Sequence, residues 1–125
     1  MTDAELYRIA EQARENAYAP FSGFRVGAAL EAADGTVYTG VNVENSSYGA
    51  TICAERAAFV KAISEGAREF RSIAISAGDV PSLPCGICRQ FMYEFAPELA
   101  IVTGADEDHL ETAVLSDLLP KGFTL

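Results

Sequence analysis

Three cysteines constrain this chain more than any other feature, because binding one metal would force two distant segments to meet. Cys53 stands in a Cys-Ala-Glu-Arg segment, and Cys85 and Cys88 stand in a later Pro-Cys-Gly-Ile-Cys segment. Three thiolates fill three corners of a zinc tetrahedron and leave the fourth corner for water, as catalytic zinc sites do. The sequence therefore predicts that two helix starts converge on one zinc ion per chain, held by Cys53, Cys85 and Cys88.

Glu55 and Arg56 follow the first cysteine closely enough to act on the same site. Glu55 lies two residues from Cys53, within one helical turn, so its carboxylate can take a proton from the water without binding the metal. Three thiolates overcompensate the charge of Zn²⁺, which weakens the metal as a Lewis acid. We expect the Arg56 guanidinium to offset this excess by donating hydrogen bonds to the ligand sulfurs.

The charge of the chain argues against a nucleic-acid partner. It has 18 acidic and 9 basic residues, which gives a formal net charge of −9. A protein that binds a phosphate backbone needs a basic face. If a nucleobase is the substrate, we therefore expect a free nucleoside and not DNA or RNA.

The length of the chain and its use of cysteine limit the number of domains and the cellular compartment. The 125 residues, 50% of them hydrophobic, fit one globular domain that spans residues 1–125. All three cysteines belong to the metal motif, and their odd number argues against a disulfide framework, which favours a reducing cytosol. The N-terminus lacks the basic start and apolar run of a signal peptide. No apolar stretch is long enough for a membrane helix, so we expect no membrane partner.

Hydrophobic periodicity and turn residues predict alternating helices and strands. Thr2 and Glu5 form a capping box at the start of the first helix, and Asp34-Gly35 forms the turn of a hairpin. Thr51 is expected to cap a second helix that is buried on most of its circumference. We expect helices over 3–17, 51–65 and 85–95, and strands over 26–32, 36–42, 71–77, 99–103 and 112–115. This order predicts one three-layer α/β domain with a mixed sheet.

Taken singly, the other candidate residues have ordinary structural explanations. An aromatic residue such as Phe24 is most often part of a core, and Asn42 with Glu44 would normally form a strand end and a solvated turn. Tyr48 could equally be a loop residue packed against the domain. His109, the one histidine, lies in an acidic segment, where a solvated side chain is expected rather than a fourth zinc ligand.

Taken together, the motifs resemble the small, homotetrameric cytidine deaminases, and the resemblance covers nearly the whole chain. A Cys- or His-x-Glu segment followed by Pro-Cys-x-x-Cys is the signature of zinc nucleobase deaminases, and here cysteine takes the place of histidine. The implied fold is the three-layer α/β/α fold of that family, with a five-stranded mixed sheet and helices on both faces. The resemblance rests on four segments, Phe24-Arg25-Val26-Gly27-Ala28-Ala29-Leu30, Asn42-Val43-Glu44-Asn45, Cys53-Ala54-Glu55-Arg56 and Pro84-Cys85-Gly86-Ile87-Cys88-Arg89-Gln90.

The resemblance implies an activity and an assembly. The activity is hydrolytic deamination of cytidine and 2′-deoxycytidine to uridine and 2′-deoxyuridine, with release of ammonia. Hydroxide on the zinc would attack carbon 4 of the ring, and Glu55 would shuttle protons. The assembly is a cytoplasmic homotetramer whose active sites are completed across subunits. A role in pyrimidine salvage and a role in catabolism both stay open.

The resemblance also assigns residues to the substrate. Phe24 would pack against the pyrimidine, whose planar face suits an aromatic ring. Asn42 and Glu44 would hydrogen-bond the ribose 3′-hydroxyl, and the backbone N–H of Ala54 would meet the base carbonyl. Tyr48 and Phe123 correspond to positions that family members use near the site, partly across subunit boundaries.

This chain departs from the family pattern in two places. Leu83 stands before the Pro-Cys motif, where the family usually has serine, so only a backbone carbonyl remains there as a polar contact near the leaving amine. The segment that ends in Phe123 matches the family only approximately.

Three other functions compete with this interpretation. The Cys-x-x-Cys pair at a helix start also occurs in thiol–disulfide oxidoreductases, but that function leaves Cys53, Glu55 and Arg56 unexplained. A closed structural zinc site needs a fourth protein ligand. An aminohydrolase for another base or for a nucleoside-like antibiotic is the nearest alternative, and the pair Asn42 and Glu44 favours a ribose-bearing pyrimidine over it.

Overall fold

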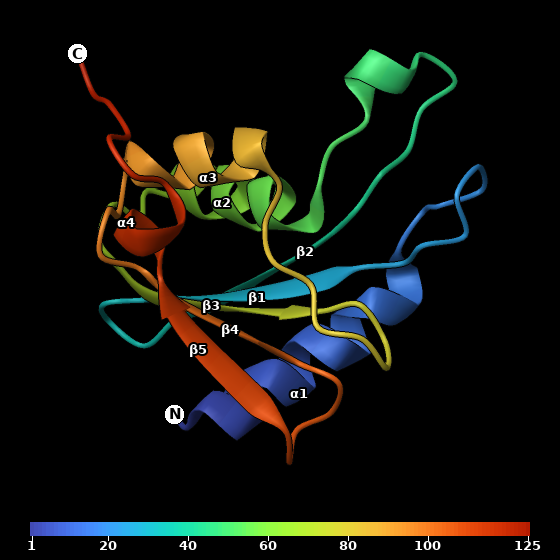
Figure 1. Ribbon diagram of the computed structural model, residues 1–125, viewed down its shortest axis with the longest axis horizontal. Helices are drawn as coiled ribbons and strands as arrows, with labels where there is room; N and C mark the ends of the chain where they lie inside the picture. Colours follow the sequence, from blue (N-terminus) through green and yellow to red (C-terminus); the bar gives the residue numbers. More distant parts are fainter.

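A five-stranded mixed sheet forms the centre of the computed structural model, which describes residues 1–125 (Figure 1). The strand order is β2-β1-β3-β4-β5; β3 and β4 are parallel, and the other neighbouring pairs are antiparallel. This confirms the predicted α/β class and five-stranded mixed sheet. The elements are α1 (Asp3–Ala13), η1 (Arg14–Asn16), β1 (Gly27–Ala32), β2 (Val37–Val41), η2 (Tyr48–Ala50), α2 (Ala54–Ser64), β3 (Phe70–Ser76), α3 (Gly86–Tyr93), β4 (Ala100–Gly104), β5 (Leu110–Val114) and α4 (Leu115–Leu118).

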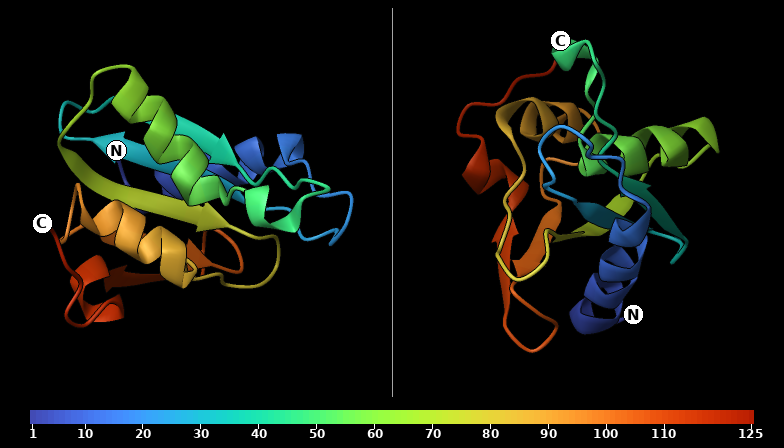
Figure 2. Two further views of the ribbon diagram at one scale, coloured as in Figure 1. Left: turned by 90° about the horizontal axis from the view of Figure 1, so that it is seen from above. Right: turned by 90° about the vertical axis from the view of Figure 1, so that its right-hand side faces the viewer.

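Helices cover both faces of the sheet, so the molecule has three layers. α1 packs on one face, and α2 and α3 lie next to each other on the opposite face (Figures 1 and 2). Because successive strand residues point to opposite faces, Ile73 and Ile75 of β3 belong to the cluster under α2 and α3, while Ala74 belongs to the cluster under α1. Two separate buried clusters therefore hold the layers together. None of the helices is both long and apolar enough to cross a membrane.

The first helix begins as predicted and ends earlier than predicted. The Thr2 hydroxyl accepts a hydrogen bond from the Glu5 backbone N–H at 3.1 Å, and the reciprocal bond completes the capping box. The α-helix ends at Ala13 and tightens into η1, whereas the sequence predicted helix to residue 17. The cause is tertiary: Tyr18 pairs with Val43 in an isolated bridge, which draws the chain away from the helix axis.

The second helix begins at Ala54, and the prediction that Thr51 caps it is wrong. Its N-cap is Cys53, whose side chain makes no capping hydrogen bond. Ile52 exchanges two backbone hydrogen bonds with Val43, at 2.9 and 3.0 Å. This pairing keeps the chain extended up to Cys53 and places the sulfur at the helix tip.

Burial of the second helix is one-sided, which corrects the expectation that most of its circumference is covered. Ala54, Glu55, Ala58, Phe59 and Ala62 face the sheet and α3 and are buried. Val60 on the outer face is 46% exposed. Small alanines on the inner face, rather than apolar residues all round, therefore let the helix lie close to the sheet.

The remaining boundaries differ from the predictions by small amounts. The hairpin turn is present, with Gly35 at φ 90° and the Asp34 carboxylate accepting a hydrogen bond from the Thr36 N–H at 3.0 Å. All five strands lie within two residues of their predicted bounds, and α3 is shorter than the predicted 85–95. The sequence analysis predicted neither η2 nor α4, because each is too short to show a helical repeat.

Candidate metal centre and active site

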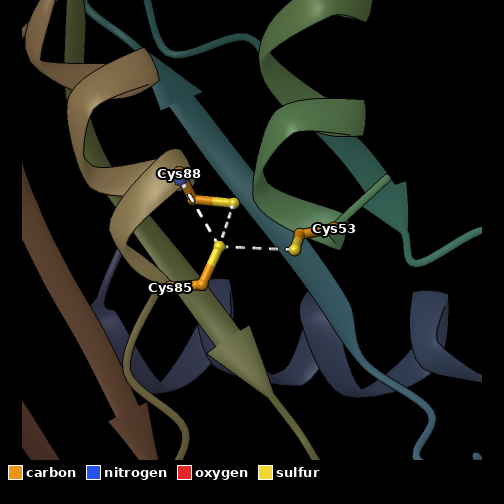
Figure 3. Close-up of side chains that lie close together, drawn as sticks. All are labelled: Cys53, Cys85 and Cys88. Atoms are coloured by element: carbon orange, nitrogen blue, oxygen red, sulfur yellow. Dashed lines mark hydrogen bonds between the residues drawn. The ribbon is translucent and has the colours of Figure 1, made fainter. Parts of the chain in front are cut away.

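Three cysteine sulfurs meet where α2 and α3 begin (Figure 3). Cys53 is the N-cap of α2, Cys85 is the N-cap of α3, and Cys88 lies in the first turn of α3. The Sγ atoms of Cys53 and Cys85 are 3.6 Å apart, those of Cys85 and Cys88 are 3.3 Å apart, and all three lie within 4.8 Å of one another. Sulfurs 2.3 Å from a tetrahedral zinc are about 3.8 Å apart. The trio therefore fits one zinc ion.

No fourth ligand accompanies the three sulfurs. The group of metal-ligating side chains contains only the three cysteines, and His109 lies elsewhere with its Nδ1 2.8 Å from an Asp106 oxygen. Cys88 is buried, Cys53 is half-buried and Cys85 is exposed, so the trio opens toward solvent on one side. A three-sulfur set with an open side matches the donor set of a catalytic zinc site and differs from the closed four-ligand structural type.

The surroundings of the sulfurs favour the ionised form of one of them. A hydrogen bond from the Cys88 thiol, aided by the Arg56 guanidinium, lowers the pKa of Cys53 to about 5. The same interaction with Cys53, together with burial, raises the pKa of Cys88. Two of the sulfurs also lie at helix N-termini, where the partial positive charge of the helix stabilises thiolate.

Arg56 lies where the sequence analysis placed it, against a ligand sulfur. One of its terminal nitrogens donates to Cys53 Sγ at 3.7 Å and to the Thr51 carbonyl oxygen at 3.4 Å. Its Nε is buried and has no hydrogen-bond partner in the chain. The guanidinium is therefore fixed beside the metal ligands, and some of its N–H groups remain free to donate further hydrogen bonds.

Glu55 is the buried carboxyl group of the site. It is only 4% exposed, although carboxyl groups are rarely buried without a charged partner. Burial, with the nearby Cys53 thiolate adding to it, raises the pKa of Glu55 to about 7. Perturbed carboxyl groups of this kind are typical of functional sites.

A cavity of about 200 Å³ opens beside the sulfurs and contains most of the predicted site. Four of the predicted substrate or catalytic residues line it, namely Phe24, Asn42, Ala54 and Glu55. Two of the three cysteines, Cys53 and Cys85, also line it, while Cys88 is buried and is not part of the lining. The complete lining is Phe24, Val26, Asn42, Thr51, Ile52, Cys53, Ala54, Glu55, Ser82, Leu83 and Cys85.

Asn42 fixes the wall that carries Phe24. Its Nδ2 donates to the Phe24 carbonyl oxygen at 2.8 Å, and its Oδ1 accepts from the Val26 N–H at 2.9 Å. A side-chain amide offers two donor hydrogens and two acceptor lone pairs. One hydrogen and one lone pair of Asn42 are therefore left for a bound molecule.

Glu44 and Tyr48 line a second, adjoining cavity of about 360 Å³. Glu44 Oε1 accepts hydrogen bonds from the N–H groups of Phe21 and Ser22 at 2.9 and 3.1 Å, and Oε2 accepts from the Ser22 hydroxyl. The hydroxyl of Ser22, followed by these backbone donors, lowers the pKa of Glu44. Thr51 lines both cavities, so the two are neighbours.

Phe123 is the one predicted substrate-binding residue that lines neither cavity. Its side chain is 62% exposed, and its carbonyl oxygen accepts a hydrogen bond from Gln90 Nε2 at 2.9 Å. Within a single chain, the structure therefore does not bring Phe123 to the metal centre.

Several residues that line the cavity were not predicted from the sequence, among them Thr51, Ile52 and Ser82. Ile52 could have been predicted as a cavity residue, because it directly precedes a ligand cysteine. Arg89 holds the loop before α3. Its Nε donates to the Pro84 carbonyl oxygen at 2.7 Å, and one terminal nitrogen donates to the Leu118 carbonyl oxygen at 2.8 Å.

Comparison with known proteins agrees with this geometry. Residues 1–104 match the family model described as the cytidine and deoxycytidylate deaminase zinc-binding region. The chain is 48% identical over 121 residues to a cytidine deaminase from Halalkalibacterium halodurans, covering 95% of this chain and 92% of that protein. It is 45% identical over 122 residues to a cytidine deaminase from Sporosarcina psychrophila, covering 96% and 90%.

A solved structure shows the same fold over its full length. The crystal structure of cytidine deaminase from Burkholderia pseudomallei superimposes with a TM-score of 0.93 at 46% identity, covering 98% of this chain and 100% of that one. The family model, the sequence relatives and the solved structure all agree with a three-cysteine zinc site beside a buried carboxyl group. The chain belongs to the cytidine and deoxycytidylate deaminase family of zinc-binding proteins.

Proposed function

We propose that this protein catalyses the hydrolytic deamination of free cytidine and 2′-deoxycytidine to uridine and 2′-deoxyuridine, with release of ammonia. One observation carries the proposal: a three-sulfur centre opens into a cavity whose wall holds a buried carboxyl group. The names of the relatives support the same substrate. The net charge of −9 accords with a nucleoside substrate and not with a nucleic acid.

Cys53, Cys85 and Cys88 would hold the zinc. Zinc bound there supplies Lewis-acid activation of water, whose pKa falls from 15.7 to about 7 in zinc enzymes. Arg56 neutralises part of the excess thiolate charge through its contact with Cys53 Sγ. The positions of the sulfurs at two helix tips keep their separation fixed without a disulfide.

Glu55 would move the protons of the reaction. Its carboxyl group lines the cavity next to Cys53, at the start of α2. From there it can accept a proton from the attacking water and deliver it to ring nitrogen 3. It can later pass the second proton of the water to the amino group on carbon 4, which leaves as ammonia. Positioned acid–base groups contribute roughly 10²- to 10⁴-fold to a rate.

The cavity walls would bind the nucleoside. Phe24 offers an aromatic face to the pyrimidine, and the N–H of Ala54, in the first helical turn, is free to donate to the base carbonyl. Asn42 and Glu44 would hydrogen-bond the ribose 3′-hydroxyl with their remaining capacity. Tyr48 in the adjoining cavity would extend this sugar-binding side.

We also propose that residues 1–125 act as one catalytic domain within a cytoplasmic homotetramer. Phe21, Tyr48, Ile87 and Phe123 are large apolar side chains at least half exposed, which favours burial against other subunits. Phe123 would then reach a site across a subunit boundary, because it lines neither of the two site cavities in its own chain. Three free cysteines suit a reducing compartment.

A substrate panel tests the proposal directly. Purified, zinc-loaded protein is incubated with cytidine, cytosine, CMP, adenosine and blasticidin S, while ultraviolet absorbance and ammonia are followed. We expect conversion of cytidine, loss of conversion after chelation of the metal, and recovery when zinc is restored. Conversion of another member of the panel in place of cytidine would refute the proposed substrate.

A further inference from the structure

Leu83 lines the metal-side cavity and also a second space that the proposed reaction does not use. This second space is a cavity of about 140 Å³ lined by Leu83, Ile101, Thr103, Glu111, Thr112, Ala113 and Leu118. Leu83 is the one residue that lines both cavities, and it is 49% exposed. An aliphatic side chain that is half exposed has room to change rotamer, so Leu83 can shift between the two spaces that it lines.

The loop that carries Leu83 is held firmly on both sides. The N–H of Ser82 donates to the buried Thr103 hydroxyl at 2.9 Å. On the other side, Arg89 Nε donates to the Pro84 carbonyl oxygen at 2.7 Å. The backbone around Leu83 is thus fixed at two points, and only the side chain is free to adapt to a ligand.

Pyrimidine geometry places the reacting amine against this loop. The base carbonyl, ring nitrogen 3 and the 4-amino group follow one another along a single edge of cytosine. In the proposed function, Ala54 and Glu55 on α2 meet the first two of these groups. In this orientation the amine extends past Glu55 toward the segment before α3, whose residues in the cavity lining are Ser82, Leu83 and Cys85.

We propose that Leu83 determines leaving-group specificity and adapts this site to pyrimidine nucleosides with a small alkyl group on the 4-amino nitrogen. This inference rests on the proposed function. The Leu83 side chain gives the leaving amine an apolar neighbour, against which a methyl group can be buried. The cavity beyond it provides space into which the leucine side chain can move.

The reaction with such a substrate is the same hydrolysis with a different leaving group. N4-methylcytidine and water give uridine and methylamine. The bond from carbon 4 to the water oxygen forms, the bond from carbon 4 to the amine nitrogen breaks, and the protons of the water pass to the departing methylamine and ring nitrogen. No oxidant or further reactant is needed.

Two substitutions separate the polarity of Leu83 from its volume. Leu83→Asn keeps the approximate size and removes the apolar surface, so kcat/KM for N4-methylcytidine relative to cytidine should fall about fourfold, the value of one buried methylene group. Leu83→Ala joins the two cavities, so the same ratio for N4-propylcytidine should rise severalfold above that of the unmodified protein. Val80→Asn is the matched control, because Val80 lies in the same loop, is 45% exposed and lines neither cavity.

Binding gives a readout that does not depend on turnover. In a Glu55→Gln background, calorimetry measures the Kd of cytidine and N4-methylcytidine with and without Leu83→Asn. We expect the ratio of the two Kd values to shift about fourfold toward cytidine when the leucine is replaced, again the value of one buried methylene group.

The outcomes distinguish this inference from the proposed function. Deamination of cytidine with substrate ratios that are the same in Leu83→Asn, Leu83→Ala and Val80→Asn would overturn the role of Leu83 and leave the proposed function intact. If cytidine is not deaminated at all, the proposed function fails, and an unchanged Kd ratio would then reject the role of Leu83 as well.

Discussion

Gly40 of β2 lies directly against Ala58 of α2, and no side chain fits between them. A Cβ atom added to Gly40 would stand 2.3 Å from the Ala58 backbone nitrogen and 2.5 Å from the Ala54 carbonyl oxygen. Real Cβ atoms do not approach backbone atoms this closely, so any other residue would push the helix outward. Since Ala54 directly follows Cys53, this contact sets how close the first zinc ligand can come to α3.

Gly40→Ala should damage both stability and metal binding. Overpacking of this kind costs about 1–3 kcal/mol, and the displaced helix would carry Cys53 away from Cys85. We expect a lower free energy of unfolding in urea and weaker zinc retention in a chelator competition. Gly49→Ala is the control, because a Cβ there meets nothing within 4 Å. Equal stability and zinc affinity in the two variants would contradict this account of the contact.

Arg56→Ala should slow turnover while the protein keeps its zinc. The guanidinium donates to Cys53 Sγ, and hydrogen bonds to charged groups contribute about 1.5–3 kcal/mol, so kcat should fall roughly 10- to 100-fold. Arg68→Ala is a matched control, since its guanidinium sits at the other end of α2 and donates to the Ile63 and Ala67 carbonyl oxygens. A kcat for Arg56→Ala equal to that of the control would exclude the proposed role.

Glu55→Gln should abolish most of the activity without releasing the metal. The amide has the size of the carboxyl group and cannot shuttle protons, so the rate should fall by roughly 10²- to 10⁴-fold. Zinc content, measured by atomic emission, should stay at one ion per chain, because the three cysteine sulfurs are positioned to bind a metal without Glu55. Zinc loss in step with activity would show instead that Glu55 is a ligand.

Removing the Ser22 hydroxyl should make substrate binding at the proposed ribose side more sensitive to acid, so that binding weakens at a higher pH. The Ser22 hydroxyl and the Phe21 and Ser22 N–H groups hold the pKa of Glu44 below its ordinary value. A carboxyl group with a lowered folded-state pKa contributes stability above its ordinary pKa and loses it as the pH falls through the folded-state pKa. Ser22→Ala should raise the Glu44 pKa, so KM for cytidine should begin to rise at a higher pH than in the unmodified protein. Superimposable KM–pH profiles for the two proteins would rule out this coupling.

The metal centre could be predicted from the sequence because its information is local. Cys53 and Glu55 are two residues apart, and Cys85 and Cys88 are three apart, so each pair is placed by a single helical turn. Strand positions were also predictable, because apolar runs bounded by turn residues such as Asp34-Gly35 are local signals.

The missed features depend on contacts between segments far apart in the chain. Threonine is a common helix N-cap, so Thr51 was predicted to cap the second helix. The pairing of Ile52 with Val43 instead keeps that stretch extended. The first helix ends early because Tyr18 pairs with the same Val43. Leu83 lines two cavities, and the walls of the second one come from β4, β5 and α4. No local sequence pattern around Leu83 reveals this arrangement.

The most direct measurement is X-ray absorption spectroscopy at the zinc edge of the purified, zinc-loaded protein. We predict three sulfur neighbours at about 2.3 Å and one oxygen neighbour at about 2.0 Å. Four sulfur neighbours, a histidine nitrogen in the shell or fewer than three sulfurs would contradict an open three-cysteine centre.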